Sequence, residues 1–210
     1  TMTTRLAGSS RSASTATQKP GDVFRQPSDE KQYSLGSRLE TRARRSARRM
    51  RMETRVTSIT KEVIIGDDRP TVLIGERINP AGKKKLAEAL KAGNLEIIRK
   101  EALAQVESGA DILDINVSTF GVDEKTLLPQ AMQVVFNTVD IPLCLDSSDP
   151  RALEATLKVC KGKPLINSVT GEEHSLAKIL PLVKDYGVAV IGLVQDDEGI
   201  PKDTERRVRV

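Results

Sequence analysis

Aromatic residues are scarce in this chain of 210 residues, which has three Phe, two Tyr and no Trp. A ligand site in such a chain would depend on hydrogen bonds more than on stacking. Histidine occurs only once, at His174, which stands at an expected helix start and is interpreted as a surface residue. The sequence shows neither a Ser-His nor a Cys-His catalytic pair. No Cys and His cluster has metal-ligand spacing, so we expect no metal site.

Long apolar runs and cysteine pairs are also missing. No stretch approaches the roughly 18 to 20 apolar residues of a membrane span, so we expect no membrane segment. The first residues lack the apolar centre of a secretory signal. Two cysteines, Cys144 and Cys160, are too few for a disulfide framework and are interpreted as reduced thiols. These features together predict a cytoplasmic protein.

Charge is distributed unevenly along the chain. Residues 1–70 hold 15 Lys and Arg against 8 Asp and Glu, whereas residues 71–210 hold 18 against 21. The basic character therefore belongs to an N-terminal extension, interpreted as disordered because it is rich in Ser, Thr, Gly and Pro. Residues 38–56 could form a basic helix. A contact with nucleic acid or anionic lipid, or a transit peptide, stays open for this extension, but nucleic-acid binding by the whole protein is not expected.

The second part, residues 71–210, alternates short β-rich runs with segments of helical period. The runs start near Val72, Ile112, Pro142, Pro164 and Val188. The intervening segments have helix-start signals at Asn94, Asp123 and Asp149-Pro150, and a glycine stop at Gly187. Their expected buried stripes include Leu95, Ile98, Leu103 and Val106 in one helix, and Leu176, Ile179, Leu180 and Val183 in another. This order predicts βαβ units around a parallel sheet.

Polar side chains interrupt the apolar runs where each predicted strand ends. Period two puts Leu113, Ile115 and Val117 on one face of a strand, and Asp114 and Asn116 on the other. The remaining ends carry Glu76, Asp146 and Asn167. One such residue could simply cap the next helix. Four neighbouring strands ending this way predict a ligand site, because ligands bind at the carboxyl ends of parallel strands.

The residue types at these ends restrict the ligand chemistry. A carboxylate accepts two parallel N–H bonds, and an Asn side chain both donates and accepts. This set suits a neutral heterocycle with an amidine or guanidine edge. No glycine-rich phosphate loop of the GxGxxG or Walker type is present.

Five motifs in order now resemble a known family. The first three are Gly75-Glu76-Arg77-Ile78-Asn79, then Asp111-Ile112-Leu113-Asp114-Ile115-Asn116-Val117, then Leu143-Cys144-Leu145-Asp146-Ser147-Ser148. The fourth is Lys163-Pro164-Leu165-Ile166-Asn167-Ser168, and the fifth is Ile191-Gly192-Leu193 with Gly199-Ile200-Pro201-Lys202-Asp203. Together they resemble the methyltetrahydrofolate:corrinoid methyltransferases and the pterin-binding domain of cobalamin-dependent methionine synthase. The wider superfamily includes dihydropteroate synthase. The resemblance covers about residues 71–210.

The resemblance implies an α/β fold, a TIM (β/α)8 barrel that binds methyltetrahydrofolate at the C-terminal ends of its strands. It implies that Asp146 and Asn167 bind the pterin ring. Glu76, Asn79, Asp114 and Asn116 match positions that line the same mouth, with less defined roles. The reaction that it implies moves a methyl group from N5 of the folate to the cobalt of a corrinoid (cobalamin) carried by a partner protein.

The chain departs from the family pattern in its length. From Thr71 it has 140 residues, whereas a complete barrel needs about 250. We therefore expect a barrel truncated after about five βα units, with little or no methyltransferase activity as an isolated chain. The catalytic residue stays unassigned, because the family's Asn near N5 belongs to a later strand.

Two other functions stay open from the residues. The first is dihydropteroate synthase chemistry on the same fold, although the Glu76 to Pro80 run looks like the methyltransferase version. The second is a non-enzymatic protein whose basic extension docks a partner. A homodimer is also possible.

Overall fold

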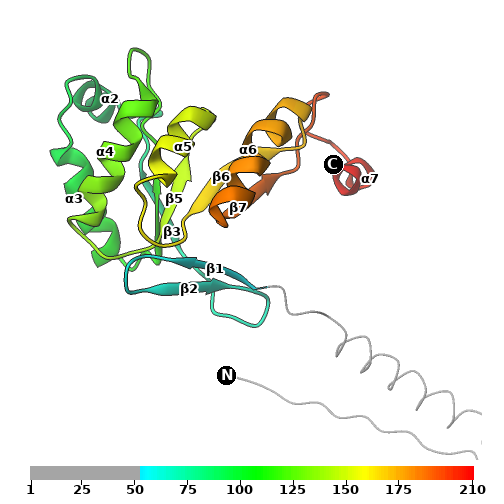
Figure 1. The fold of residues 1–210 in the computed structure, drawn as a ribbon, viewed down its shortest axis with the longest axis horizontal. Helices are drawn as coiled ribbons and strands as arrows, with labels where there is room; N and C mark the ends of the chain where they lie inside the picture. Colours follow the sequence, from blue (N-terminus) through cyan, green and yellow to red (C-terminus); the bar gives the residue numbers. More distant parts are fainter. Residues whose placement is uncertain (1–52) are drawn as a thin grey trace, which may run out of the picture. The chain divides into compact units, whose positions relative to one another are not determined.

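The computed structural model describes residues 53–210, which form two sheets and a layer of helices (Figure 1). The elements in chain order are β1 (Thr54–Thr57), β2 (Glu62–Ile65), β3 (Ile74–Ile78), α2 (Lys84–Lys91), α3 (Glu96–Glu107), β4 (Ile112–Ile115), α4 (Glu124–Phe136), β5 (Leu143–Asp146), α5 (Pro150–Leu157), β6 (Leu165–Thr170), α6 (Glu173–Tyr186), β7 (Ala189–Leu193) and α7 (Thr204–Arg209).

The larger sheet confirms the predicted α/β architecture. Its strands follow the order β3-β4-β5-β6-β7, and every neighbouring pair is parallel. Each strand begins within two residues of its predicted start. Consecutive helices pack side by side, α3 on α4, α4 on α5 and α5 on α6. The sheet therefore has the strand-helix order of the first five units of a β/α barrel.

Two apolar clusters pack against the two faces of this sheet. The outer face carries Leu113, Ile115, Leu145 and Ile166, which pack with the helices in the large cluster. The inner face is apolar only where the strands begin, and there Ile112, Cys144 and Leu165 form the small cluster together with Val56 of β1. Period two thus sends alternate residues of each strand into different cores, as predicted for Leu113, Ile115 and Val117.

The β1-β2 hairpin corrects the prediction for residues 1–70. Residues 54–57 and 62–65 pair as antiparallel strands, so they are neither a disordered extension nor the end of a basic helix over 38–56. Residues 1–52 of both predictions lie outside the described residues. The hairpin closes over the small cluster, where Val56 is fully buried against inner-face residues. Strand β1 also pairs with Lys163, since the backbones of Thr57 and Lys163 exchange hydrogen bonds. Apolar burial against the sheet therefore overrides the basic composition of this region.

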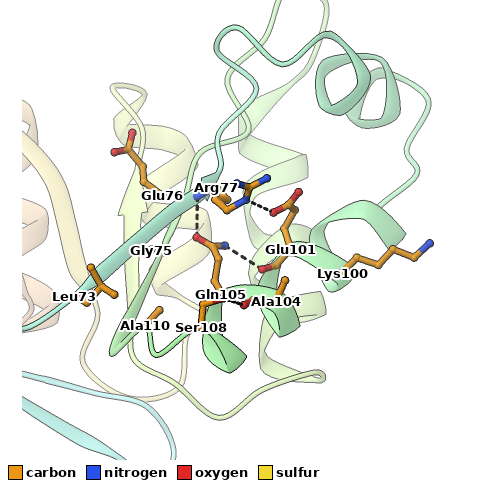
Figure 2. A pocket seen from close by; sticks show the side chains of 10 residues that line it. All are labelled: Leu73, Gly75, Glu76, Arg77, Lys100, Glu101, Ala104, Gln105, Ser108 and Ala110. Carbon is orange, nitrogen blue, oxygen red and sulfur yellow. Dashed lines mark hydrogen bonds and ion pairs between the residues drawn. The ribbon is translucent and has the colours of Figure 1, made fainter.

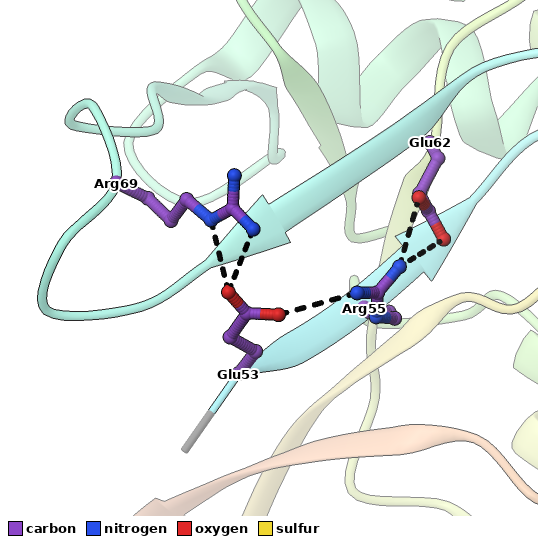
Figure 3. Close-up of polar contacts among 4 residues, drawn as sticks. All are labelled: Glu53, Arg55, Glu62 and Arg69. Carbon is purple, nitrogen blue, oxygen red and sulfur yellow. Dashed lines mark hydrogen bonds and ion pairs between the residues drawn. The ribbon is translucent and has the colours of Figure 1, made fainter. Parts of the chain in front are cut away.

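Charged side chains on the hairpin pair with one another (Figure 3). The Arg55 guanidinium donates to Glu62 at 3.1 Å and to Glu53 at 3.2 Å. Arg69 donates two bonds to the same Glu53 oxygen, at 3.0 and 2.7 Å. The Arg69 bonds, with Arg55 adding to them, lower the pKa of Glu53. The arginine Arg55, which was counted with the basic extension, is thus part of an exposed ion-pair network on a folded element.

Helix boundaries follow most of the predicted signals. Asp149 caps α5 by accepting the Arg151 N–H at 2.9 Å, with Pro150 at the first helical position. Gly187 ends α6 in the left-handed conformation that glycine adopts without strain. Asp123 precedes α4 but makes no side-chain bond to its backbone. Asn94 lies two residues before the first residue of α3, and its side chain accepts the Glu96 N–H at 3.1 Å.

Two buried stripes differ from their predictions. In α3 the buried face runs through Ile98, Ala102 and Gln105, so Leu103 lies beside it. In α6 only Ile179 is buried, and the predicted stripe members Leu176 and Leu180 are 37% and 43% exposed. Helix α6 packs against β6 and α5, which cover one side of it. Within residues 53–210 no helix has the length and apolarity to span a membrane.

Candidate active site at the carboxyl ends of the strands

The inner face of the large sheet changes from apolar to polar along every strand from β3 to β6. On β4, Ile112 is followed two residues later by Asp114, and Asn116 lies just beyond the strand. On β5, Asp146 follows Cys144 in the same way. Strand register puts Asp114 beside Cys144, and Asp146 beside Asn167. The strand ends therefore bring these predicted residues together in one mouth.

Asn116 and Asp146 form the first polar pair of this mouth. The Asn116 Nδ2 group donates to Asp146 Oδ2 at 2.9 Å. The Asn116 Oδ1 atom accepts the Ser118 N–H at 2.8 Å, which fixes the orientation of the amide. The side chain of Asn116 thus holds the Asp146 carboxylate from one side.

Asp114 and Asn167 form the second pair, deeper in the mouth. Asn167 Nδ2 donates to Asp114 Oδ1 at 3.3 Å. Asp114 is 1% exposed, and its Oδ2 atom is buried without a hydrogen-bond partner within the described residues. A buried acceptor that no protein donor satisfies is costly. This oxygen can therefore take a further hydrogen bond, from its own proton, from water or from a bound molecule.

Glu76 and Asn79 supply the β3 side of the mouth. Asn79 Nδ2 donates to Glu76 Oε1 at 3.2 Å, and Asn79 Oδ1 accepts the Ala81 N–H at 2.9 Å. Glu76 is close enough to both Asp114 and Asp146 for its charge to raise their pKa values. All six predicted residues therefore lie around the same mouth.

Three further groups at this mouth were not predicted. Ser147, which is 3% exposed, donates from Oγ to Glu124 Oε2 at 2.6 Å. The Ser147 N–H reaches the Asn167 carbonyl at 3.2 Å, which links the two strand ends. Cys144 lies beside Asp114, and burial raises the pKa of its thiol. Glu124 is the first residue of α4, and its position directly after a strand-end loop was the available signal.

A cavity of about 380 Å³ opens beside Asp146 and Asn167, within the range of small-molecule sites. Its other walls come from Ser147, Ser148, Ser168, Thr170, Glu172, His174, Ser175, Lys178 and Ile179. His174 lines this cavity, and its side chain is 66% exposed, which confirms its prediction as a surface residue. Within residues 53–210 no group of three or more His, Cys, Asp and Glu side chains forms a metal site.

Burial and mutual repulsion shift the proton equilibria of the two carboxyls. Burial, and then the charges of Asp146 and Glu76, raise the pKa of Asp114 to about 6, while the adjacent Cys144 thiol and the bond from Asn167 oppose the shift. The pKa of Asp146 is raised chiefly by burial, with the Asn116 bond opposing it. A ligand that presents N–H donors here would relieve both the desolvation and the repulsion.

We predict that Asp114→Asn changes the pH dependence of stability. A carboxyl whose pKa is higher in the folded state binds more protons in that state than in the unfolded one. The folded protein therefore loses stability as pH rises from about 4 to above 6. The variant lacks this loss. Relative to the parent, it should gain up to about 3 kcal/mol in unfolding free energy between pH 4 and pH 8. Urea unfolding across that range measures the difference.

Asp111→Asn is a suitable control for that measurement. Asp111 is an exposed carboxylate near the start of β4 that accepts the Leu73 N–H at 2.8 Å. Its replacement should change the unfolding free energy without the same added dependence on pH between pH 4 and 6. Parallel curves for Asp114→Asn and the parent would show that Asp114 is ionised like a surface group.

The part of the chain that carries this sheet and this mouth matches a family of pterin-binding enzymes. The pterin-binding enzyme family matches residues 75–209, from β3 to the last residue of α7. The chain belongs to this family. The matched region contains all six predicted site residues, and it excludes the β1-β2 hairpin.

Two curated relatives are similar to the chain. It is 35% identical over 144 residues to a methylcorrinoid:tetrahydrofolate methyltransferase of Eubacterium limosum, which covers 66% of this chain and 52% of the relative. It is 30% identical over 172 residues to a methionine synthase of Mycobacterium tuberculosis, which covers 80% of this chain and 14% of the relative. The chain thus spans about half of the first relative's length and a small part of the second.

Solved structures show a more distant similarity. A 7,8-dihydropteroate synthase of Vibrio fischeri ES114 matches with 20% identity and a TM-score of 0.47, over 72% of this chain and 53% of the synthase. A homocysteine methyltransferase of Escherichia coli matches with 15% identity and a TM-score of 0.45, over 64% of this chain and 65% of that chain.

Proposed function

We propose that this chain binds the pterin ring of N5-methyltetrahydrofolate and serves methyl transfer between this folate and the cobalt of a corrinoid carried by a partner protein. The observation that carries the proposal is the ring of carboxylates and carboxamides at four neighbouring strand ends, Glu76, Asp114, Asp146 and Asn167. Membership of the pterin-binding family supports the ligand class, and similarity to two methyltransferases supports the reaction.

Asp146 and Asn167 are the proposed ring-binding residues. They are register partners on β5 and β6 and line the same cavity. The 2-amino-4-oxo edge of a pterin has adjacent N–H donors and a carbonyl acceptor. An ionised carboxylate accepts two parallel N–H bonds, and a carboxamide can both donate and accept. The pair therefore complements this edge without a cationic side chain.

The orphan oxygen of Asp114 supports the same ligand. Its Oδ2 atom is buried without a protein donor, and its pKa of about 6 leaves it partly protonated near neutral pH. A carboxyl in this state can donate to, or accept from, a neutral heterocycle. Asn116 then orients Asp146, and Glu76 presents its carboxylate to the ligand from the β3 side of the mouth.

Methyl transfer from N5 needs an electrophilic methyl group. The amine leaves poorly as an anion, so N5 must be protonated or strongly hydrogen-bonded in the transition state. The acidic mouth favours a positive charge on the bound ring through Glu76, Asp114 and Asp146. The name of the Eubacterium limosum relative gives methylcorrinoid and tetrahydrofolate, and transfer in either direction would use the same ring-binding residues.

Calorimetric titration of the 210-residue chain with N5-methyltetrahydrofolate tests the proposal. We expect saturable binding with one site. The control ligand is p-aminobenzoylglutamate, which keeps the tail of the folate and lacks the pterin. It should bind at least about tenfold more weakly, since the proposed bonds all go to the pterin edge. Equal binding of both compounds, or of neither, would contradict the proposal.

A further inference from the structure

Strand β3 has one residue more than the paired segment of β4, and this extra residue lies directly before the mouth. Ile74 and Gly75 pair with Ile112 and Leu113, but the next pair joins Ile78 to Ile115. Three steps on β3 therefore match two steps on β4. This is the count of a β-bulge, which bends a strand and changes the direction of the side chains beyond it.

The bulge changes which face of the sheet the later residues occupy. Ile74 belongs to the inner cluster, and strict alternation would place both Glu76 and Ile78 on that inner face. Instead Ile78 is fully buried in the outer cluster among the helices. The extra residue lets Glu76 face the acidic mouth while Ile78, two residues later, contributes to the outer core. Asn79 then emerges at the rim, within hydrogen-bond distance of Glu76.

A bulge leaves a backbone group without its ladder partner, and here a side chain from α3 takes that role. Gln105 Oε1 accepts the Arg77 N–H at 2.8 Å, and Gln105 Nε2 donates to the Glu101 carbonyl at 3.2 Å. Gln105 is 4% exposed and occupies the buried face of α3 with Ile98 and Ala102. A buried glutamine costs free energy unless its amide is satisfied, and both ends of this one are.

The residues around Gln105 are arranged for this contact (Figure 2). Gly75 has no side chain, and a Cβ atom there would lie 2.6 Å from Gln105 Oε1 and 3.2 Å from the Ala110 Cβ. The Arg77 side chain extends to α3 as well, donating to Glu101 at 2.8 Å. Figure 2 shows Glu76 directed away from these α3 residues, on the other side of β3. The α3 side of the strand thus holds the backbone, and the other side presents the carboxylate.

We propose that Gln105 is a positioning residue for the mouth, which holds the β3 bulge through the Arg77 amide and thereby directs Glu76 and Asn79 toward the ligand. The inference rests on the proposed function only for the ligand; the contact itself is independent of it. Gln105 lies on the opposite side of β3 from the site, so it would act without touching the folate.

The backbone contact is tested first, by amide hydrogen exchange of the ligand-free chain. Gln105→Met keeps the size of the side chain and removes the acceptor, so the Arg77 amide should exchange about tenfold faster, the effect of one lost hydrogen bond. Gln105→Glu keeps an acceptor and should retain protection. Gly75→Ala, which displaces Gln105 without removing it, should also expose the amide. Unchanged protection of Arg77 in Gln105→Met would overturn the proposal.

The direction of Glu76 is tested second, again without ligand. The Glu76 charge helps to raise the pKa of Asp146, so Glu76→Gln should move the carboxyl titration of Asp146, measured by NMR, to lower pH. Gln105→Met should move it in the same direction. Lys100→Met, a substitution of an exposed residue on the same helix α3, should not move it through β3. An unmoved Asp146 titration in Gln105→Met would show that Gln105 stabilises the fold only.

The link to the ligand is tested by a double-mutant cycle on N5-methyltetrahydrofolate binding. Glu76→Gln and Gln105→Met should each weaken binding, and the double variant should bind as weakly as Glu76→Gln alone, since both changes remove the same contact. Multiplying effects would overturn the positioning role. If the parent chain fails to bind the folate, the proposed function fails, and the exchange and titration results still decide whether Gln105 directs Glu76.

Discussion

Replacing Asp146 by Asn should weaken binding of N5-methyltetrahydrofolate about 5- to 150-fold. The loss corresponds to about 1 to 3 kcal/mol for a charge-assisted bond. The Asp146 carboxylate accepts a hydrogen bond from Asn116 at 2.9 Å. This bond orients the carboxylate, which lines the cavity. An Asn side chain there offers one acceptor and one N–H group, and the N–H group would face the ring's own donors. Titration calorimetry of parent and variant measures the change.

The matched control is Asp185→Asn, the same substitution on an exposed residue near the C-terminal end of α6. It should leave the folate affinity unchanged. Thermal unfolding of each variant separates loss of the site from loss of the fold. An Asp146→Asn variant that is folded and has the parent's affinity would remove Asp146 from the proposed ring-binding pair.

Replacing Val56 by Asp should destabilise the chain by more than about 3 kcal/mol, because an unpaired carboxylate would enter an apolar cluster. Val56 is fully buried against Ile112, Cys144 and Leu165 on the inner face of the sheet. The charge either stays buried at this cost or forces the hairpin off the strand starts. Denaturant unfolding measures the change in free energy.

Thr54→Asp is the control on the same strand, since Thr54 is exposed. It should change stability by less than about 0.5 kcal/mol, as surface substitutions do. Equal effects of the two variants would mean that the hairpin does not hold the sheet.

Because the hairpin packs on the sheet, a deletion that asks whether the N-terminal region docks a partner should end before Glu53. Removing residues 1–70 would also remove the hairpin.

Local patterns predicted the parallel sheet correctly, and they predicted which polar residues stand at its strand ends. The intervals between β-rich runs predicted the βα order, and period two separated Asp114 and Asn116 from the outer-face residues Leu113 and Ile115. Carboxyl ends of parallel strands share one edge, so the strand-end positions alone predicted that Asp146 and Asn167 would meet. The roles of these residues in binding stay predictions.

The sequence failed where distant contacts decide the outcome. Arg55 and its neighbours belong to a basic region by composition, yet residues 54–57 form a strand because Val56 finds an apolar partner surface more than 50 residues away. The buried stripe of α3 includes Gln105, a residue that hydropathy places on the outside. The helical spacing of Gln105 from Ile98 and Ala102 was the only signal in the sequence that this polar residue is buried.

The sequence by itself determined the alternation of strands and helices and the polar character of the strand ends, because both depend on local period and residue type. Only the tertiary structure decided that Asp114 keeps a buried, unsatisfied oxygen, that a hairpin closes the inner cluster, and that a bulge held by Gln105 directs Glu76 to the mouth. Each of these depends on hydrogen bonds and burial between segments far apart in the chain. Such contacts are set by packing and leave no periodic trace in the sequence.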